Sequence, residues 1–96
     1  MATKEKIIAD IKSYLQTSNF SGFYIGITND VERRLFKEHN VSKQNGCWIY
    51  IKANSKSIAQ DVEEYFLDKG MQGDTGGGND DSTYVYCYQI TSYTVE

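Results

Sequence analysis

Apolar residues in this chain switch between two kinds of spacing, and this switching constrains the fold more than any other feature of the sequence. Three stretches repeat apolar residues every three or four positions, as amphipathic helices do, and three alternate apolar and polar residues, as half-buried strands do. In chain order, helical and strand-like by turns, they are 4–16, 22–28, 30–40, 47–52, 57–69 and 83–91. The sequence therefore predicts an α/β (α+β) fold of order α-β-α-β-α-β, a small three-stranded, mainly antiparallel sheet flanked by three helices.

The length of the chain fits one unit of this kind. Ninety-six residues suffice for one domain, and we expect residues 1–96 to form it. No apolar run approaches the roughly 18 residues that a membrane helix needs, and the amphipathic N-terminal stretch lacks the pattern of a signal peptide. We therefore expect a cytoplasmic protein with no membrane partner.

Local signals mark the ends of the predicted helices. Thr3 is placed to cap the first helix, and Asn29 or Asp30 the second. The residues Ser-Ile-Ala-Gln at 57–60 match a capping box, which predicts that the third helix begins there. The stretch 70–81 contains five of the eight glycines, so it predicts a loop, and its first glycine suits the end of the third helix.

The two cysteines do not indicate a zinc site. Cys47 and Cys87 are 40 residues apart, and His39 is the one histidine of the chain. Four nitrogen or sulfur ligands cannot be assembled from these three residues without help from carboxylates. We therefore expect two buried, free thiols.

The charge of the chain is unevenly distributed. The net charge of −3 argues against a dedicated nucleic-acid binder held by bulk electrostatics. Residues 30–56 hold six basic and three acidic residues, a net charge of +3, whereas residues 61–81 hold seven acidic residues and one lysine, a net charge of −6. A polyanion can therefore dock on the first region, and the second favours a divalent cation.

Helical projections place the two members of each pair of adjacent like charges on different sides of their helix. In the second predicted helix, Arg34 lies at the border of the apolar stripe and Arg33 points away from it. In the third, Glu63 lies at the border and Glu64 faces away. We therefore expect one half-buried arginine and one half-buried glutamate beside the sheet.

Alternation also sorts the strands into two faces. In the first strand, aliphatic and phenylalanine side chains lie on one side, and Tyr24 and Gly26 lie on the other. In the last strand, Tyr84, Tyr86 and Tyr88 share one face. One surface of the sheet is therefore expected to be apolar and the other to carry tyrosine hydroxyls.

Two motifs with defined spacing resemble a known family. The run 24–40, YIGITNDVERRLFKEHN, with Arg34 eight residues after Gly26, resembles the small stand-alone bacterial members of the GIY-YIG nuclease superfamily. The stretch 59–67, AQDVEEYFL, is similar to the third-helix motif of that family, in which a glutamate, here Glu63, holds a metal ion.

The first motif of that family, a GIY-type strand, immediately precedes the YIG strand, but here a helix and the turn 17–21 take its place. The last predicted strand resembles the missing one, moved to the other end of the chain. We therefore hypothesise a circularly permuted GIY-YIG fold in which Tyr86 replaces the GIY tyrosine, with Tyr84 or Tyr88 as alternatives. This hypothesis requires the last strand to contact the strand that carries the YIG residues.

The resemblance implies catalytic roles for five residues. Glu63 would hold the metal, and Arg34 would donate two hydrogen bonds to the scissile phosphate. Tyr86, with Tyr24 beside it, would position or deprotonate the attacking water. His39 is a further catalytic candidate, but it follows Arg34 by five residues where close relatives have four. One extra residue turns a side chain by about 100° on an α-helix, so a packed histidine is the alternative.

The resemblance also implies contacts with the substrate. The candidates for these contacts are Gly26, Arg33, Lys37 and Asn79. Asn79 resembles a late asparagine of the family, and the alternative is an ordinary loop residue. For Arg34 and Glu63, the alternative is a structural ion pair.

Taken together, the resemblance implies a metal-dependent endonuclease that hydrolyses phosphodiester bonds in DNA, with Mg²⁺ or Mn²⁺ as its cofactor. Because the net charge gives little intrinsic affinity for DNA, a targeting protein partner would deliver the substrate or catalysis would be weak. The alternative function is a catalytically inactive GIY-YIG-like module that binds nucleic acid or protein through its tyrosine face.

Overall fold

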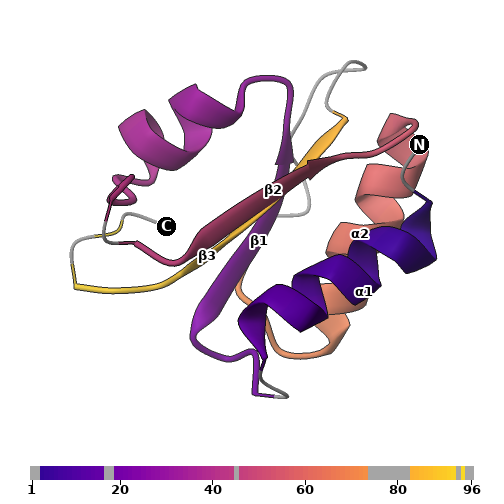
Figure 1. The fold of residues 1–96 in the computed structure, drawn as a ribbon, viewed down its shortest axis with the longest axis horizontal. Coiled ribbons are helices and arrows are strands. Elements are labelled where there is room, and N and C mark those ends of the chain that lie inside the picture. Colours follow the sequence, from indigo (N-terminus) through magenta and orange to yellow (C-terminus); the bar gives the residue numbers. More distant parts are fainter. Residues whose placement is uncertain (1–2, 17–18, 45, 74–82, 93, 95–96) are drawn as a thin grey trace.

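Three strands and three helical segments alternate along the chain, in the order that the sequence predicts (Figure 1). The computed structural model describes residues 3–16, 19–44, 46–73, 83–92 and 94. The elements are α1 (Lys4–Leu15), β1 (Phe23–Thr28), η1 (Arg33–Glu38), β2 (Trp48–Lys52), α2 (Lys56–Asp68) and β3 (Tyr84–Gln89). The second helical segment departs from expectation, because η1 is wound as a π-helix rather than an α-helix.

The last strand in the sequence is the middle strand of the sheet. The strand order is β1-β3-β2, and β3 pairs with both neighbours in antiparallel orientation. Tyr24 lies opposite Tyr88, and Gly26 lies opposite Tyr86. The contact between the last strand and the YIG strand that the permutation hypothesis requires is therefore present.

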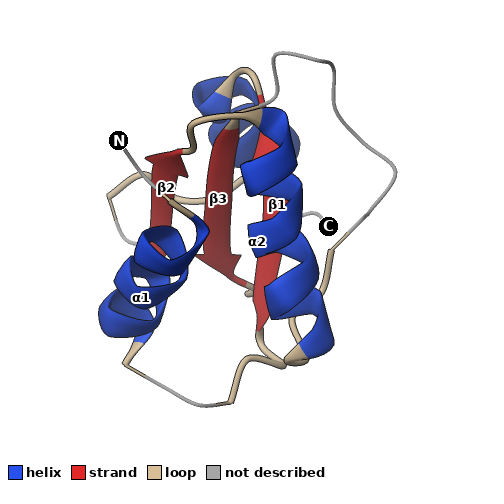
Figure 2. Ribbon diagram, turned by 90° about the vertical axis from the view of Figure 1, so that its right-hand side faces the viewer, coloured by secondary structure: helices blue, strands red, loops and turns tan. Residues whose placement is uncertain are grey.

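The two α-helices cover one face of the sheet, and η1 lies against the other (Figures 1 and 2). The face beneath α1 and α2 is apolar, as the alternation predicts, and Ile25, Val85 and Cys87 on it are fully buried. Ile7 and Ile11 of α1 and Val62 and Phe66 of α2 pack into the same cluster. This layer is the main hydrophobic core.

The other face carries the tyrosines. Tyr24, Tyr86 and Tyr88 are buried there against Leu35 of η1 and Val41, which follows it. The same side of β2 carries Trp48 and Tyr50, since these residues lie opposite Tyr88 and Tyr86 in the register. We call this surface the tyrosine face.

The ends of α2 correct one prediction and confirm another. The helix begins at Lys56, one residue earlier than predicted, because Ser55 rather than Ser57 is the cap: Ser55 is extended and its side chain accepts a hydrogen bond from the backbone N–H of Ile58. At its C-terminus, Gly70 adopts a φ of 110° and Met71 N–H donates to the carbonyl of Phe66. The helix therefore stops as the glycine predicts.

The chain that follows α2 runs along the outer edge of β1. Gln72 accepts a hydrogen bond from the N–H of Ile25 and donates to the carbonyl of Phe23. A side chain at Gly73 would overlap the backbone oxygen of Ile25. The edge of β1 is therefore covered by a segment that approaches too closely for any residue larger than glycine.

Thr3 caps α1 as predicted, by accepting a hydrogen bond from the N–H of Lys6. Both cysteines are free thiols, but the prediction that both are buried is only half right: Cys87 in β3 is fully buried, whereas Cys47, just before β2, is only partly buried. Within the described residues, no helix has the length and hydropathy of a membrane span.

Candidate active site

The π-winding of η1 decides where its functional side chains point. The backbone N–H of His39 donates to the carbonyl of Arg34, five residues earlier, at 2.9 Å. In this i to i+5 pattern, residues five apart lie on the same side of the helix, as residues four apart do in an α-helix. α-Helical geometry predicted that the extra residue between Arg34 and His39 would turn the His39 side chain away. The π-winding keeps it on the same side as Arg34. Both side chains reach Tyr86.

His39 bridges two tyrosine hydroxyls of β3. Its Nε2 atom is 2.9 Å from the hydroxyl of Tyr86, and its Nδ1 atom is 3.0 Å from the hydroxyl of Tyr88. A neutral imidazole has one N–H donor and one bare nitrogen acceptor, so one tyrosine donates to the ring and the other accepts from it. His39 is only 3% exposed. It is thus both a packed histidine and a hydrogen-bonded residue. We call the group that it forms with its neighbours the buried cluster, or the cluster: Tyr24, Arg34, His39, Glu63, Tyr86 and Tyr88.

Tyr24 completes the aromatic part of the cluster. Its ring stacks on Tyr88 at a centroid distance of 5.2 Å and lies 4.7 Å from the His39 ring. Beside it on β1, Gly26 lies directly under the Tyr86 hydroxyl, and a side chain there would overlap that group. The glycine of the YIG motif therefore makes room for the tyrosine of the last strand.

Arg34 connects this cluster to the surface. Its guanidinium hydrogen-bonds Tyr86 and forms an ion pair with Glu38 one turn later, while about a third of its side chain (32%) is exposed. Burial tends to lower the pKa of Arg34, but the hydrogen bonds to Glu38 and Tyr86 outweigh it, so the net shift is upward. Arg34 is a permanent cation at the mouth of the cluster.

Glu63 approaches the cluster from α2. It is 4% exposed, more buried than the border position predicted from its helical projection, because α2 packs closely against β1 and β3. Its carboxylate lies near enough to Tyr86 for its negative charge to raise the pKa of that hydroxyl. Glu64, as predicted, faces solvent.

Tyr86 is the group on which these side chains converge. Burial raises the pKa of its hydroxyl to about 12, with smaller upward contributions from Tyr24 and Glu63, while Arg34 opposes the shift through its charge and its hydrogen bond. The hydroxyl is therefore protonated at neutral pH. It sits between a base, His39, and a cation, Arg34.

The structure does not bring every predicted residue to this cluster. The side chain of Arg33 is half exposed and pairs with Glu38 at 3.0 Å, and Lys37 is exposed. Asn79 lies outside the described residues. Arg34 and Glu63 interact with Glu38 and Tyr86, respectively, so no ion pair between them is needed to account for their placement.

Two participants were missed by the sequence reasoning. Tyr88 was only an alternative to Tyr86, yet both hydroxyls contact His39. Glu38 pairs with both arginines. Its position four residues after Arg34 was a usable signal, whereas the role of Tyr88 depends on the register between β1 and β3, which no local pattern reveals.

Comparison with protein families identifies the chain. The family model that describes the GIY-YIG catalytic domain matches residues 13–72, which is 60 of the 96 residues. Comparisons with curated proteins and with solved structures found no match. The matched segment contains the YIG strand, η1 and α2 with Arg34, His39 and Glu63, and it ends before β3. The chain therefore belongs to the GIY-YIG catalytic domain family, a family of nuclease type.

Proposed function

We propose that the protein is a metal-dependent endonuclease that hydrolyses phosphodiester bonds in DNA. One observation carries the proposal: Arg34, His39 and Glu63, which come from two different elements, all act on the hydroxyl of Tyr86. A structural tyrosine needs one hydrogen-bond partner, not a cation, an imidazole and a carboxylate together. The family of the chain supports the same reaction class.

Arg34 is suited to bind the scissile phosphate. Its partly exposed guanidinium is held by Oε1 of Glu38, so a carboxylate oxygen occupies the position of an oxyanion ligand. A phosphate offers acceptors of the same kind with more charge, so it can replace Glu38 in this contact. The cation would then stabilise the negative charge that grows on the phosphoryl oxygens during hydrolysis.

Tyr86 and His39 are suited to accept the proton that the attacking water loses. A hydroxyl with a pKa of about 12 is a weak acid, so it acts as a base only after it passes its own proton to a neighbour. The imidazole of His39 lies at hydrogen-bond distance from this hydroxyl, and a bare ring nitrogen can accept its proton. Arg34 would stabilise the phenolate that remains.

The cofactor of the proposal is a divalent cation, Mg²⁺ or Mn²⁺, held by Glu63. Among the residues that the structure describes, no group of three or more His, Cys, Asp or Glu side chains could hold a metal. One buried carboxylate still fits Mg²⁺, because this ion keeps most of its waters and needs only one or two carboxylates. When bound, the ion supplies Lewis-acid activation of the phosphate.

We also propose that the chain is a circularly permuted single domain, residues 1–96, in which β3 replaces the first strand of the family. The family match spans residues 13–72 and ends before β3, and β3 carries three tyrosines and pairs with the YIG strand. Tyr86 is favoured over Tyr84 and Tyr88 because it lies opposite Gly26 and contacts Arg34.

The test is cleavage of plasmid and of single-stranded DNA with Mg²⁺ or Mn²⁺, in wild type and in two variants of neighbouring glutamates. We expect Glu63→Gln to abolish metal-dependent cleavage and Glu64→Gln to retain it, because only Glu63 approaches Tyr86. Thermal unfolding of both variants checks that they fold. Equal activity in the two variants would remove Glu63 from the site.

A second function, a catalytically inactive binding module, is favoured by one observation. Tyr24, His39, Glu63 and Tyr86 are all less than a tenth exposed, so Arg34 is the member of the cluster that a ligand meets first. In that case the cluster would stabilise the fold, and Arg34 would only bind. Absence of cleavage by the folded wild type with either ion would favour this alternative over the nuclease.

A further inference from the structure

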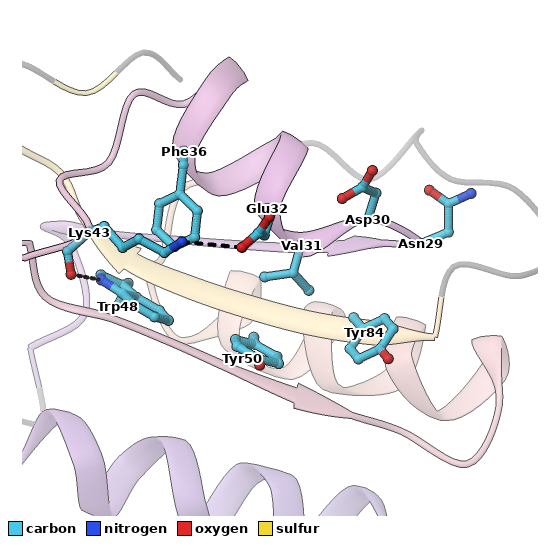
Figure 3. A pocket seen from close by; sticks show the side chains of 9 residues that line it. All are labelled: Asn29, Asp30, Val31, Glu32, Phe36, Lys43, Trp48, Tyr50 and Tyr84. Atoms are coloured by element: carbon cyan, nitrogen blue, oxygen red, sulfur yellow. Dashed lines mark hydrogen bonds and ion pairs between the residues drawn. The ribbon is translucent and has the colours of Figure 1, made fainter.

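A groove separate from the buried cluster lies on the same face of the sheet (Figure 3). Its cavity volume is about 300 Å³. Trp48 and Tyr50 of β2 and Tyr84 of β3 form one side, and Phe36 of η1 and Lys43 form the other. The groove is therefore the part of the tyrosine face that η1 leaves open.

The aromatic rings in the groove are arranged for stacking. The rings of Trp48 and Tyr50 are nearly parallel, with 6° between their planes and 6.3 Å between their centroids. The edge of Phe36 meets Trp48 at a centroid distance of 5.0 Å, which fixes the indole. Tyr50 is 48% exposed, whereas Tyr24, Tyr86 and Tyr88 of the same sheet are buried. A flat aromatic ligand can therefore lie on this strip.

Cations border the aromatic strip. The ammonium of Lys52 lies 5.8 Å from the Tyr84 ring, and that of Lys43 lies 5.0 Å from the Phe36 ring. Lys43 also neutralises Glu32, at 3.2 Å, while Asp30 accepts a hydrogen bond from the backbone of Arg33. Asp30, Glu32 and Lys43 line the groove and Lys52 lies at its border, so charge contributes little here and the exposed ring faces are what the groove offers a ligand.

The groove lies beside the candidate active site on the same face of the sheet. Tyr50 lies directly opposite Tyr86 on neighbouring strands, and Tyr84 precedes Tyr86 by two residues on the same face. The helical segment η1 contributes Phe36 to the groove and Arg34 to the cluster. Side chains paired across strands are about 5 Å apart, so one nucleic-acid strand can reach both places.

We propose that this groove binds an unpaired base of a single-stranded DNA segment, stacked on Tyr50 and Trp48. This inference rests on the proposed function and specifies its substrate class. In a continuous duplex, the faces of the bases are already stacked on their neighbours, so the strip has nothing to bind there. An unpaired base offers a free ring face, and stacking supplies the affinity that the net charge of −3 does not.

Binding is tested without metal, so that cleavage cannot contribute. Trp48 is the single tryptophan of the chain, so its fluorescence reports directly on the groove as a short oligothymidylate is titrated in the presence of a chelator. We expect Tyr50→Ala to weaken binding by about 5- to 150-fold, the range for loss of one stacked base. Tyr50→Phe, which keeps the ring, should bind within about twofold of wild type.

The matched control is Tyr14→Ala. Tyr14 is 47% exposed, like Tyr50, but belongs to α1 on the opposite face, where its hydroxyl reaches the backbone of Trp48. It therefore also reports any indirect effect through β2, and it should bind like wild type. Equal affinity of wild type and Tyr50→Ala, or tighter binding of a blunt duplex than of the oligothymidylate, overturns the inference.

The two proposals fail in different ways. If the stacking site is wrong, Tyr50→Ala binds normally, while Glu63→Gln still abolishes cleavage. If the nuclease function is wrong, no protein cleaves DNA with either ion, while the difference between Tyr50→Ala and Tyr50→Phe in oligothymidylate binding remains.

Discussion

The two faces of the sheet are buried by different kinds of contact. On the apolar face, α1 and α2 cover aliphatic side chains and Cys87, and the contacts are non-directional. On the tyrosine face, a short π-helical segment covers Tyr24, Tyr86 and Tyr88, and the hydroxyls of the two β3 tyrosines hydrogen-bond His39. Among the described residues, no buried side-chain nitrogen or oxygen lacks a partner.

The apolar face therefore contributes mainly to stability, and the tyrosine face carries the residues suited to catalysis. Non-directional packing tolerates small shifts and contributes in proportion to the area buried. A buried polar network depends on every member, since removal of one leaves another without its partner. We therefore expect changes on the apolar face to alter the free energy of unfolding, and changes on the tyrosine face to alter activity more than stability.

The largest effect is expected for Tyr86→Phe. The substitution removes the hydroxyl that Arg34 and His39 contact but keeps the ring. Cleavage should fall by about 100- to 10 000-fold, the range for loss of a general acid–base group, and stability by about 1–3 kcal/mol. Plasmid cleavage and urea unfolding measure the two effects. Tyr84→Phe, on the same face but outside the cluster, is the control, and equal cleavage rates for both variants would exclude Tyr86 from catalysis.

The apolar face is tested by Phe66→Ala. Phe66 is fully buried and meets Phe20 edge-on at 5.5 Å, so its truncation leaves a cavity. We expect the free energy of unfolding to fall by about 3–5 kcal/mol, with the cleavage rate of the folded fraction unchanged. Urea unfolding gives the first quantity and cleavage at low temperature the second. A large loss of activity per folded molecule would show that the two faces are not independent.

Alkaline pH should lower the free energy of unfolding through one residue on each face, Tyr86 and Cys87. The folded state raises the pKa of Tyr86 from about 10 to about 12, mainly by burial, so the hydroxyl stays protonated in the folded chain after it ionises in the unfolded one. The stability it contributes is fully present below pH 10 and is lost as the pH rises to about 12, by roughly 3 kcal/mol in total. Burial raises the pKa of Cys87 to about 12 as well, from an ordinary value of 9.0.

Urea unfolding of wild type and Tyr86→Phe at several pH values isolates the tyrosine contribution, because Cys87 is common to both proteins. The wild-type free energy of unfolding should fall more steeply above pH 10 than that of the variant. Parallel curves would mean that the hydroxyl ionises equally easily in both states.

The smallest effect is expected from deletion of Lys37. This exposed residue lies in η1, and its removal shortens the interval from Arg34 to the histidine from five residues to four. An α-helical turn then places both side chains on the same side, so the bonds to Tyr86 are kept and stability should change by less than about 1 kcal/mol. The assay is again urea unfolding, with deletion of Val85 in β3 as the contrasting case, because a one-residue slip there exchanges the two faces. Equal damage from both deletions would contradict the role assigned to the π-winding.

Periodicity was sufficient to predict the order of the elements, the limits of the strands and the two faces, but not the π-winding of η1. The strands lie within two residues of their predicted limits, and the expected apolar and tyrosine surfaces are both present. The order of elements follows from where apolar spacing changes, which is a local property of the sequence.

The site was only partly predictable. Spacing indicated Tyr24, Arg34 and Glu63, but the burial of Glu63 depends on how tightly α2 packs on the sheet. The bridging role of His39 depends on a π-helical turn that has no distinct residue signature, and on the register that places Tyr88 beside Tyr24. These are consequences of tertiary packing, so local patterns do not encode them.

The central place of β3 has a consequence for how the protein is made. On the ribosome, β1 and β2 are synthesised before β3, but they do not pair with each other. Both lack their partner strand until β3, which begins at Tyr84, has been synthesised. Because nearly all of the sheet is formed by contacts distant in sequence, α1, β1, η1, β2 and α2 must leave the exit tunnel without a sheet on which to pack. Arrest of translation before residue 84 therefore yields a nascent chain with two unpaired strands, a natural substrate for chaperones, whereas arrest after β3 has emerged yields a chain that can fold.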